Sequence, residues 1–120
     1  MVRPLVVKVT CAGEAAERCN QAFTVAATAA ASGAQVSLWL TGEAAWFGIP
    51  GRAAELDLPL ATPLADLLAA VLAAGRVTVC SQCAARRDIG EEDVLPGVRV
   101  AGAAVFAEEI LAPEVQALVY

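Results

Sequence analysis

The sequence predicts an α/β fold, namely a single domain with a doubly wound, mostly parallel five-stranded sheet flanked by helices. Two observations lead to this class. Short apolar runs alternate along the chain with longer stretches in helical spacing, and this order is typical of parallel strands joined by right-handed crossovers. The length of 120 residues suits one domain with its own core, so we expect residues 1–120 to form a single unit.

Five runs of apolar and β-branched residues are expected to be the strands. The first run is apolar enough to lie centrally in a parallel sheet. The predicted strands are residues 5–10, 36–40, 77–79, 97–101 and 115–120. If they follow the common order 2-1-3-4-5, the first and third strands are neighbours, and their carboxyl ends flank the point where the strand order reverses.

Helices are expected between the strands, where apolar residues recur at helical spacing. The predicted helices are residues 14–31, 64–74, 82–87 and 103–111. Residues 44–60 should lack a long helix because glycine and proline interrupt them, and such a segment usually covers a site or forms an interface. The aromatic pair in it, Trp46 and Phe47, suits an oligomer interface if it is exposed.

The composition excludes several classes of function. The formal net charge is −5 and no basic stripe runs along the chain, which argues against a nucleic-acid partner. The chain contains no histidine, which excludes Ser-His-Asp and Cys-His catalytic sites and zinc sites that use imidazole. The sequence has neither a phosphate loop nor a G-x-G-x-x-G motif, so nucleotide binding is unsupported and we expect no cofactor.

The hydrophobic content of 58% reflects alanine in helical spacing more than any membrane segment. The longest apolar candidate, residues 64–74, is too short to cross a bilayer and contains Asp66. Lys8 interrupts the first apolar run, so the N-terminus is not expected to be a signal peptide. We therefore expect a cytoplasmic protein without a membrane partner, whose four cysteines are reduced, catalytic or metal-binding.

Cys80 is the strongest candidate for a functional residue. It follows the third predicted strand, and Ser81 is expected to be the N-cap of the helix after it. Unpaired N–H groups and the positive end of a helix dipole favour a thiolate at such a junction. Cys80, Cys83 and Arg87 would share one face of this helix. The alternative is that Cys80 is a small apolar residue at a strand end.

Cys83 completes a Cys-x-x-Cys pair with Cys80. It could be a resolving thiol for Cys80, supply half of a tetrahedral metal site, or be a packing residue on the helix face. A tetrahedral thiolate site needs a second such pair, and Cys11 and Cys19 are spaced too widely to form one. Cys11 could be an assisting thiol close to Cys80 or a buried strand-end residue, whereas Cys19 is expected in the core.

Charged and polar neighbours of Cys80 complete the candidate site. We expect Arg87 to hold an anionic sulfur species and Ser81 to contact the substrate at the helix start. Surface arginines are common, so a solvent-facing role is the alternative. The acidic runs Glu91–Asp93 and Glu108–Glu109 are expected to be solvated.

Three stretches resemble the DsrE/DsrF family of small sulfur-transfer proteins, and its TusD-related members in particular. One is the strand that ends in cysteine, followed by an alanine-rich helix, two arginines and a β-branched residue. The second is a strand with its turn, and the third is the C-terminal part. The matching residues are Val79-Cys80, Ala84-Ala85, Arg86-Arg87 with Ile89, then Val36–Glu43, and finally Gly97–Gly102 through Ala117–Tyr120.

The resemblance implies a sulfur carrier or sulfurtransferase. Cys80 would accept sulfane sulfur as a persulfide from a donor protein and pass it to an acceptor thiol. It also implies a homo-oligomer, a trimer or hexamer. Two residues depart from the family pattern: Asp88 stands where a glycine is usual, and Cys83 stands where alanine is common. A second thiol could resolve the persulfide and release sulfide.

Two other hypotheses stay open at this point. The first is a non-catalytic, oligomeric binding or assembly module of the same fold, whose cysteines only pack. The second is a zinc site between subunits, built from Cys80 and Cys83 of two chains.

Overall fold

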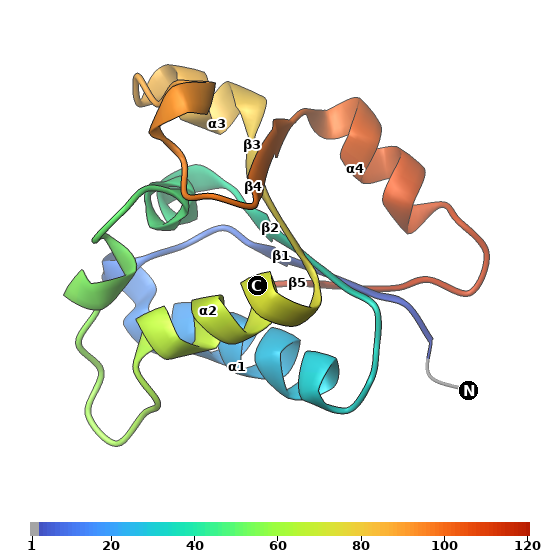
Figure 1. Cartoon of the computed structure of the whole chain (residues 1–120), viewed down its shortest axis with the longest axis horizontal. Helices are drawn as coiled ribbons and strands as arrows, with labels where there is room; N and C mark the ends of the chain where they lie inside the picture. The colour runs from blue at the N-terminus through green and yellow to red at the C-terminus, as the bar shows by residue number, and fades with distance from the viewer. Residues whose placement is uncertain (1–2) are drawn as a thin grey trace.

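A sheet of five parallel strands forms the centre of the computed structural model, which describes residues 3–120. The strands run side by side in the order β4-β3-β2-β1-β5, as Figure 1 shows. The predicted α/β class and parallel five-stranded sheet are therefore confirmed. The strands are β1 (Leu5–Val9), β2 (Val36–Leu40), β3 (Arg76–Cys80), β4 (Val98–Ala101) and β5 (Gln116–Val119).

The predicted strand order is wrong, because β2 lies between β1 and β3. β2 occupies the centre of the sheet and buries side chains on both faces, Leu38 on one and Trp39 on the other. Strands that are buried on both faces read as mostly apolar runs, and β1 and β2 are alike in this, since each has a single polar residue, Lys8 or Ser37. Their composition therefore could not indicate which of them is central.

Four helices connect the strands, and they lie on opposite faces of the sheet. Figure 1 shows α1 and α2 together on one side and α4 on the other, with α3 beyond the end of β3. From β1 to β4, each new strand is added on the same side of the one before it, and the chain then crosses back over the sheet to place β5 beside β1. Because crossovers between parallel strands are right-handed, this reversal of direction places α4 on the face opposite α1 and α2. The helices are α1 (Ala16–Ala31), α2 (Leu64–Ala74), α3 (Ser81–Arg86) and α4 (Ala103–Ile110).

The main apolar core fills the space between the sheet and the helices α1 and α2. Val7, Leu38 and Val77 occupy one row across three strands of the sheet and are fully buried. Phe23 from α1 and Val71 from α2 belong to the same cluster and are also fully buried. The alanines of α1 allow this helix to approach the sheet closely, which explains their helical spacing.

The opposite face of the sheet is more polar. Its central row runs across four strands as Lys8, Trp39, Thr78 and Arg99. Phe106 of α4 packs edge-on against Trp39, with ring centroids 5.2 Å apart, and Lys8 Nζ lies 5.0 Å from the centroid of Phe106. The side chains of this face therefore pack against one helix, α4, and charged groups are part of the packing.

Residues 42–55 form three-residue-per-turn helices instead of a long helix, η2 (Gly42–Gly48) and η3 (Ala53–Glu55). Phe47 is only 5% exposed, and its ring packs edge-on against Phe23 at 5.9 Å. Trp46 is partly buried beneath the guanidinium of Arg52, 4.4 Å from the ring centroid. Phe47 is thus a core residue. It is not available for the oligomer interface that we expected if the aromatic pair were exposed.

Two shorter connections complete the chain, η1 (Gly13–Ala15) before α1 and η4 (Glu91–Asp93) before β4. Within residues 3–120, none of the helices combines the length and the hydropathy that crossing a bilayer requires.

Candidate functional site

The candidate site begins where β3 passes into α3. Cys80 is the last residue of β3, where it pairs with Ala101 of β4, and it is also the N-cap residue of α3. Ser81 is therefore the first helical residue, and the prediction that it is the N-cap is wrong by one position. The reason is the pairing with β4, which extends β3 through Cys80 and leaves no residue between strand and helix.

The Cys80 thiol is partly exposed, and its surroundings favour the thiolate. Burial alone would raise its pKa, but hydrogen bonds from the Cys83 backbone N–H, the Cys83 side chain and the Gln82 backbone N–H outweigh burial. The positive charge of Lys8 acts in the same direction, and the net effect is a pKa below the ordinary value of 9.0. A thiolate is the form of cysteine that attacks other sulfur atoms.

Lys8 is a site residue that the sequence did not reveal. It was noted only as an interruption of an apolar strand, yet it lies on the α4 face of the sheet and its charge reaches Cys80. Thr78 and Cys80 alternate with buried Val77 and Val79, so Cys80 belongs to the same face as Lys8. A lone lysine in a buried strand was the available signal, but its meaning depends on the strand order.

Cys83 lies one helical turn after Cys80 and is held by the start of η2. The backbone N–H of Gly42 donates a hydrogen bond to Cys83 Sγ over 3.2 Å. Gly42 has φ +54°, and a Cβ atom at this position would lie 2.7 Å from the carbonyl oxygen of Thr10. Residues other than glycine are therefore unfavourable at position 42, and the turn that brings this N–H group to Cys83 depends on it.

Arg87 fixes α3 to η2. Its Nε and Nη2 atoms donate to Glu43 Oε2 at 2.9 and 2.8 Å, and its Nη1 donates to the Cys83 carbonyl oxygen at 3.0 Å. The side chain is 19% exposed. These contacts engage the guanidinium, so Arg87 positions the segment that carries Cys83. The expected contact of Arg87 with an anionic sulfur species stays a prediction.

The end of α3 differs slightly from the prediction. The helix ends at Arg86, with Arg87 as the C-cap, and Asp88 follows with φ +54°. A left-handed conformation at this position explains why the family pattern has glycine there, since glycine adopts it without strain. Aspartate is one of the few other residues that tolerate it.

Ser81 remains a candidate contact residue. It is partly exposed, and its Oγ lies 3.0 Å from the place that a Cβ on Gly102 would occupy. Gly102 is the N-cap of α4, so Ser81 lies beside the start of that helix.

The other two cysteines belong to the core and are separated from Cys80. Cys11 is 4% exposed, its Sγ–H donates to the Ala15 carbonyl oxygen at 3.8 Å, and burial raises its pKa. Cys19 is fully buried; burial and, to a lesser extent, the neighbouring Cys11 raise its pKa to about 12. The expectation that Cys11 and Cys80 follow neighbouring strands is wrong, because β2 separates β1 from β3.

Glu109 of α4 is not solvated, contrary to the sequence-based expectation. Its side chain is 15% exposed and accepts hydrogen bonds from Ser37 Oγ at 2.6 Å and Trp39 Nε1 at 3.0 Å. It also pairs with Arg99 and, at 3.5 Å, with Arg76. Burial opposes its ionisation, but these hydrogen bonds and the Arg99 charge lower its pKa.

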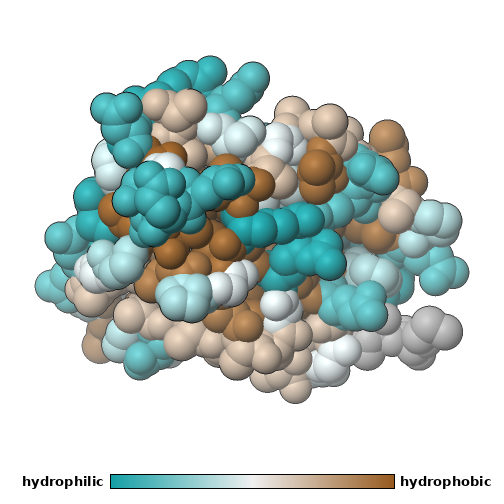
Figure 2. Space-filling view, turned by 45° about the horizontal axis from the view of Figure 1, so that its top comes forward, coloured by the Kyte–Doolittle hydropathy of each residue, from teal (hydrophilic) through white to brown (hydrophobic). Residues whose placement is uncertain are grey.

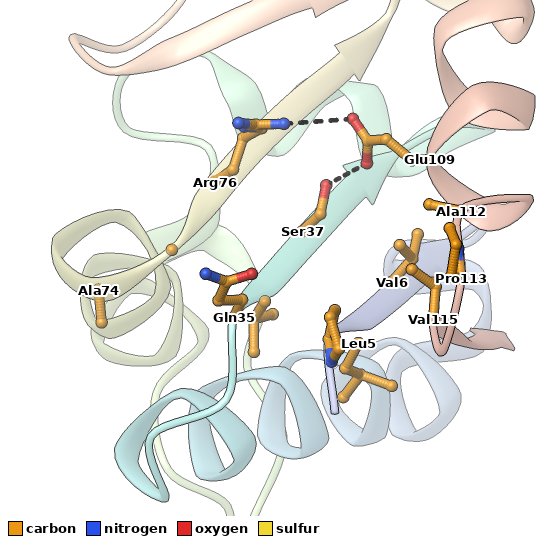
Figure 3. A pocket seen from close by; sticks show the side chains of 13 residues that line it. Leu5, Val6, Gln35, Ser37, Ala74, Arg76, Glu109, Ala112, Pro113 and Val115 are labelled. Carbon is orange, nitrogen blue, oxygen red and sulfur yellow. Dashed lines mark hydrogen bonds and ion pairs between the residues drawn. The ribbon is translucent and has the colours of Figure 1, made fainter. Parts of the chain in front are cut away.

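A hollow of about 550 Å³ lies next to this network, as Figure 3 shows with Arg76, Ser37 and Glu109 around it. Leu5, Val36 and Arg76 line it, and each stands at the start of a strand. The hollow is therefore at the amino edge of the sheet, whereas Cys80 is at the carboxyl edge. Cys80 is the partly exposed thiol whose pKa is lowered, so we place the candidate site at Cys80.

No group of three or more cysteine, aspartate or glutamate side chains lies close enough to hold a metal ion within residues 3–120. Each of the four cysteines is a free thiol.

The model of the DsrE/DsrF-like family matches residues 5–114, which is most of the chain. The chain belongs to this family. Its fold is also similar to the crystal structure of the ychN protein from E. coli, with a TM-score of 0.82 and 18% sequence identity over 99% of this chain and 100% of that chain. A search of curated proteins finds no match.

Proposed function

We propose that this DsrE/DsrF-like protein accepts sulfane sulfur as a persulfide on Cys80 and passes it to a partner thiol. Members of the family generally act in sulfur relay. The single observation that carries the proposal is the state of the Cys80 thiol, which is partly exposed and has a lowered pKa at the carboxyl edge of the sheet.

The chemistry consists of two thiol exchange steps without net oxidation. The Cys80 thiolate attacks the outer sulfur of a donor persulfide, a new sulfur–sulfur bond forms, and the donor leaves as a thiolate. An acceptor thiolate then attacks the outer sulfur on Cys80 and releases the Cys80 thiolate. The Gln82 and Cys83 N–H groups and the Lys8 charge stabilise the Cys80 thiolate, which is the nucleophile of the first step and the leaving group of the second.

The proposal includes protein partners and self-association. A carrier needs a donor protein and an acceptor protein, and we propose that the chain forms a homo-oligomer, a trimer or hexamer, in the cytoplasm. Figure 2 shows hydrophobic side chains gathered in a patch that hydrophilic groups surround. Leu111 and Val119 are also exposed, by 81% and 65%. Such surfaces suit contacts between subunits.

The test is mass spectrometry after brief exposure of the reduced protein to glutathione persulfide, with rapid alkylation to trap adducts. We expect one added sulfur atom on Cys80 in the wild type and in Cys83→Ser, and no adduct in Cys80→Ser. Cys19→Ala is the matched control, because this buried thiol takes no part in the exchange. An alkylated, sulfur-free Cys80 would instead support a non-catalytic assembly module of the same fold.

A further inference from the structure

The structure holds two thiols together at one end of α3. Cys80 is the N-cap residue of α3 and Cys83 is the third residue of that helix, and both thiols are partly exposed. Residues three apart on a helix have Cβ atoms about 5–6 Å apart. A disulfide requires a Cβ–Cβ distance of about 3.5–4.5 Å, so joining the two sulfurs takes a small backbone movement as well as side-chain rotation. Cys80 is the N-cap residue and lies outside the helix, at the junction between β3 and α3 where such a movement is local.

We propose that Cys83 is a resolving thiol, which converts a persulfide on Cys80 into a Cys80–Cys83 disulfide and releases hydrogen sulfide. The inference rests on the proposed function, since it needs a persulfide on Cys80. It adds a second activity, sulfide release, to the transfer of sulfane sulfur.

The step balances without an external oxidant. Cys83 Sγ attacks the inner sulfur of the persulfide, which is Cys80 Sγ, and the bond between the two persulfide sulfurs breaks. The outer sulfur leaves as hydrosulfide and takes the proton from Cys83. The sulfane sulfur is reduced to sulfide, while the two cysteine sulfurs are oxidised to the disulfide.

Contacts from a distant part of the chain hold Cys83 for this role. The Gly42 N–H donates to Cys83 Sγ at 3.2 Å, which fixes the side chain and offers a partner for negative charge on the attacking sulfur. Glu43 binds Arg87, which in turn donates to the Cys83 carbonyl oxygen at 3.0 Å. Cys83 also packs against the core, so the contact that distinguishes it from a purely packing residue is the hydrogen bond at its sulfur.

The two outcomes for a loaded Cys80 therefore compete. An acceptor protein that arrives in time takes the outer sulfur, and Cys80 returns to the thiolate. Without an acceptor, Cys83 removes the sulfur and leaves a disulfide, which blocks further loading until a dithiol reductant reopens it.

The experiment follows one turnover. Reduced protein is loaded with one equivalent of glutathione persulfide and desalted, and sulfide and intact mass are then followed over time. We expect the wild type to release about one equivalent of sulfide and to lose two hydrogen atoms relative to the reduced protein. Cys83→Ser should keep its adduct and release sulfide at least about tenfold more slowly.

Serine at position 83 keeps an acceptor for the Gly42 N–H, so this variant should fold as the wild type does. Cys19→Ala serves again as the matched control and should release sulfide at the wild-type rate. Treatment of the spent wild type with dithiothreitol should restore its capacity for loading.

The possible failures are distinguishable. Equal sulfide release from the wild type and Cys83→Ser would overturn the resolving role. An adduct that stays on Cys80, or that moves to Cys83 without sulfide, would do the same, while the carrier function would stand. Absence of any adduct on Cys80, including in Cys83→Ser, would refute the carrier function itself.

Discussion

At the scale of single residues, the reactivity of Cys80 results from opposing effects. Burial disfavours the thiolate, whereas backbone N–H groups, the Cys83 side chain and the charge of Lys8 favour it. The donors come from the start of α3, next to Cys80 in sequence, but Lys8 comes from β1. Its contribution can therefore be removed by a substitution far from the thiol in sequence, which leaves the start of α3 unchanged.

Substitution of Lys8 by methionine should raise the pKa of Cys80. Methionine keeps an apolar stem against Phe106, while the loss of the positive charge removes one of the effects that favour the thiolate. We therefore expect the profile of alkylation rate against pH to move to higher pH. The measurement is the pH dependence of the rate of iodoacetamide alkylation in a Cys83→Ser background, where Cys80 is the partly exposed thiol.

Lys8→Arg is the matched control, because it keeps the charge and should leave the alkylation profile close to that of the parent protein. An unchanged profile in Lys8→Met would mean that the charge of Lys8 is screened from the thiol by water.

The candidate site could be predicted only in part, because some of its residues act on near neighbours in sequence and others act on residues that only the fold brings close. Cys80 and Cys83 follow from a strand-to-helix junction, which is a property of neighbouring residues. Lys8 of β1 and Gly42 of η2 act through space from other parts of the chain, so their roles required the strand order. Ser81 was misplaced by one position because the pairing of Cys80 with Ala101 is likewise a long-range contact.

At the scale of elements, α4 is anchored to the sheet by Glu109. This carboxylate accepts hydrogen bonds from Ser37 and Trp39 of β2 and pairs with Arg99 of β4. Arg99 Nε also donates to Thr78 Oγ1 of β3 at 2.6 Å. One side chain thus joins the returning helix to the central strand β2 and to the edge strand β4, on the face that Cys80 shares.

Substitution of Glu109 by glutamine should destabilise the protein by about 1–3 kcal/mol near neutral pH, because Arg99 loses its charged partner. The pKa of Glu109 is lowered in the folded state from the ordinary 4.5, so its contribution is complete above that value. It is lost as the pH falls through the lower folded pKa. The stabilities of wild type and variant should therefore converge in acid.

Urea unfolding at about pH 7 and about pH 3 provides the measurement. The neighbouring exposed carboxylate offers a matched control, since Glu108→Gln should change the free energy of unfolding by no more than about 0.5 kcal/mol. A difference between wild type and Glu109→Gln that is the same at both pH values would contradict the assigned role.

The elements themselves were largely predictable from the sequence. The ends of β2 and α2 agree with the prediction, because clear signals bound each of them, such as Gly75 after α2. The buried role of Glu109 could not be seen, because an acidic pair on a helix reads as a solvated face. Only the path of α4 across the sheet brings one of the two carboxylates to Ser37 and Trp39.

At the scale of the whole molecule, β5 is an open edge of the sheet. Its other side pairs with β1, and three of its four residues are exposed, with Val119 at 65%. An exposed edge strand with apolar side chains is prone to associate with another chain. It is thus a natural place for contacts between subunits in the proposed oligomer.

We expect Val119→Arg to reduce the molar mass in light scattering from that of a trimer or hexamer toward that of the monomer. A charged side chain in a buried contact between subunits is strongly unfavourable. Ala73→Arg, at an exposed position of α2, should leave the oligomer intact. A wild type that is already monomeric would refute the proposed assembly, and an intact Val119→Arg oligomer would place the contact elsewhere.

The bond between Gly42 and Cys83 joins positions that are 41 residues apart. The reactive sulfur pair therefore exists only after β3 has taken its place beside β2, and an unfolded chain carries four ordinary thiols. At a fixed pH below the ordinary thiol pKa, the native protein therefore reacts faster than the unfolded chain, and the rate of alkylation measures the fraction of native molecules. Alkylation kinetics therefore provide a measure of refolding that needs no dye, label or added tryptophan.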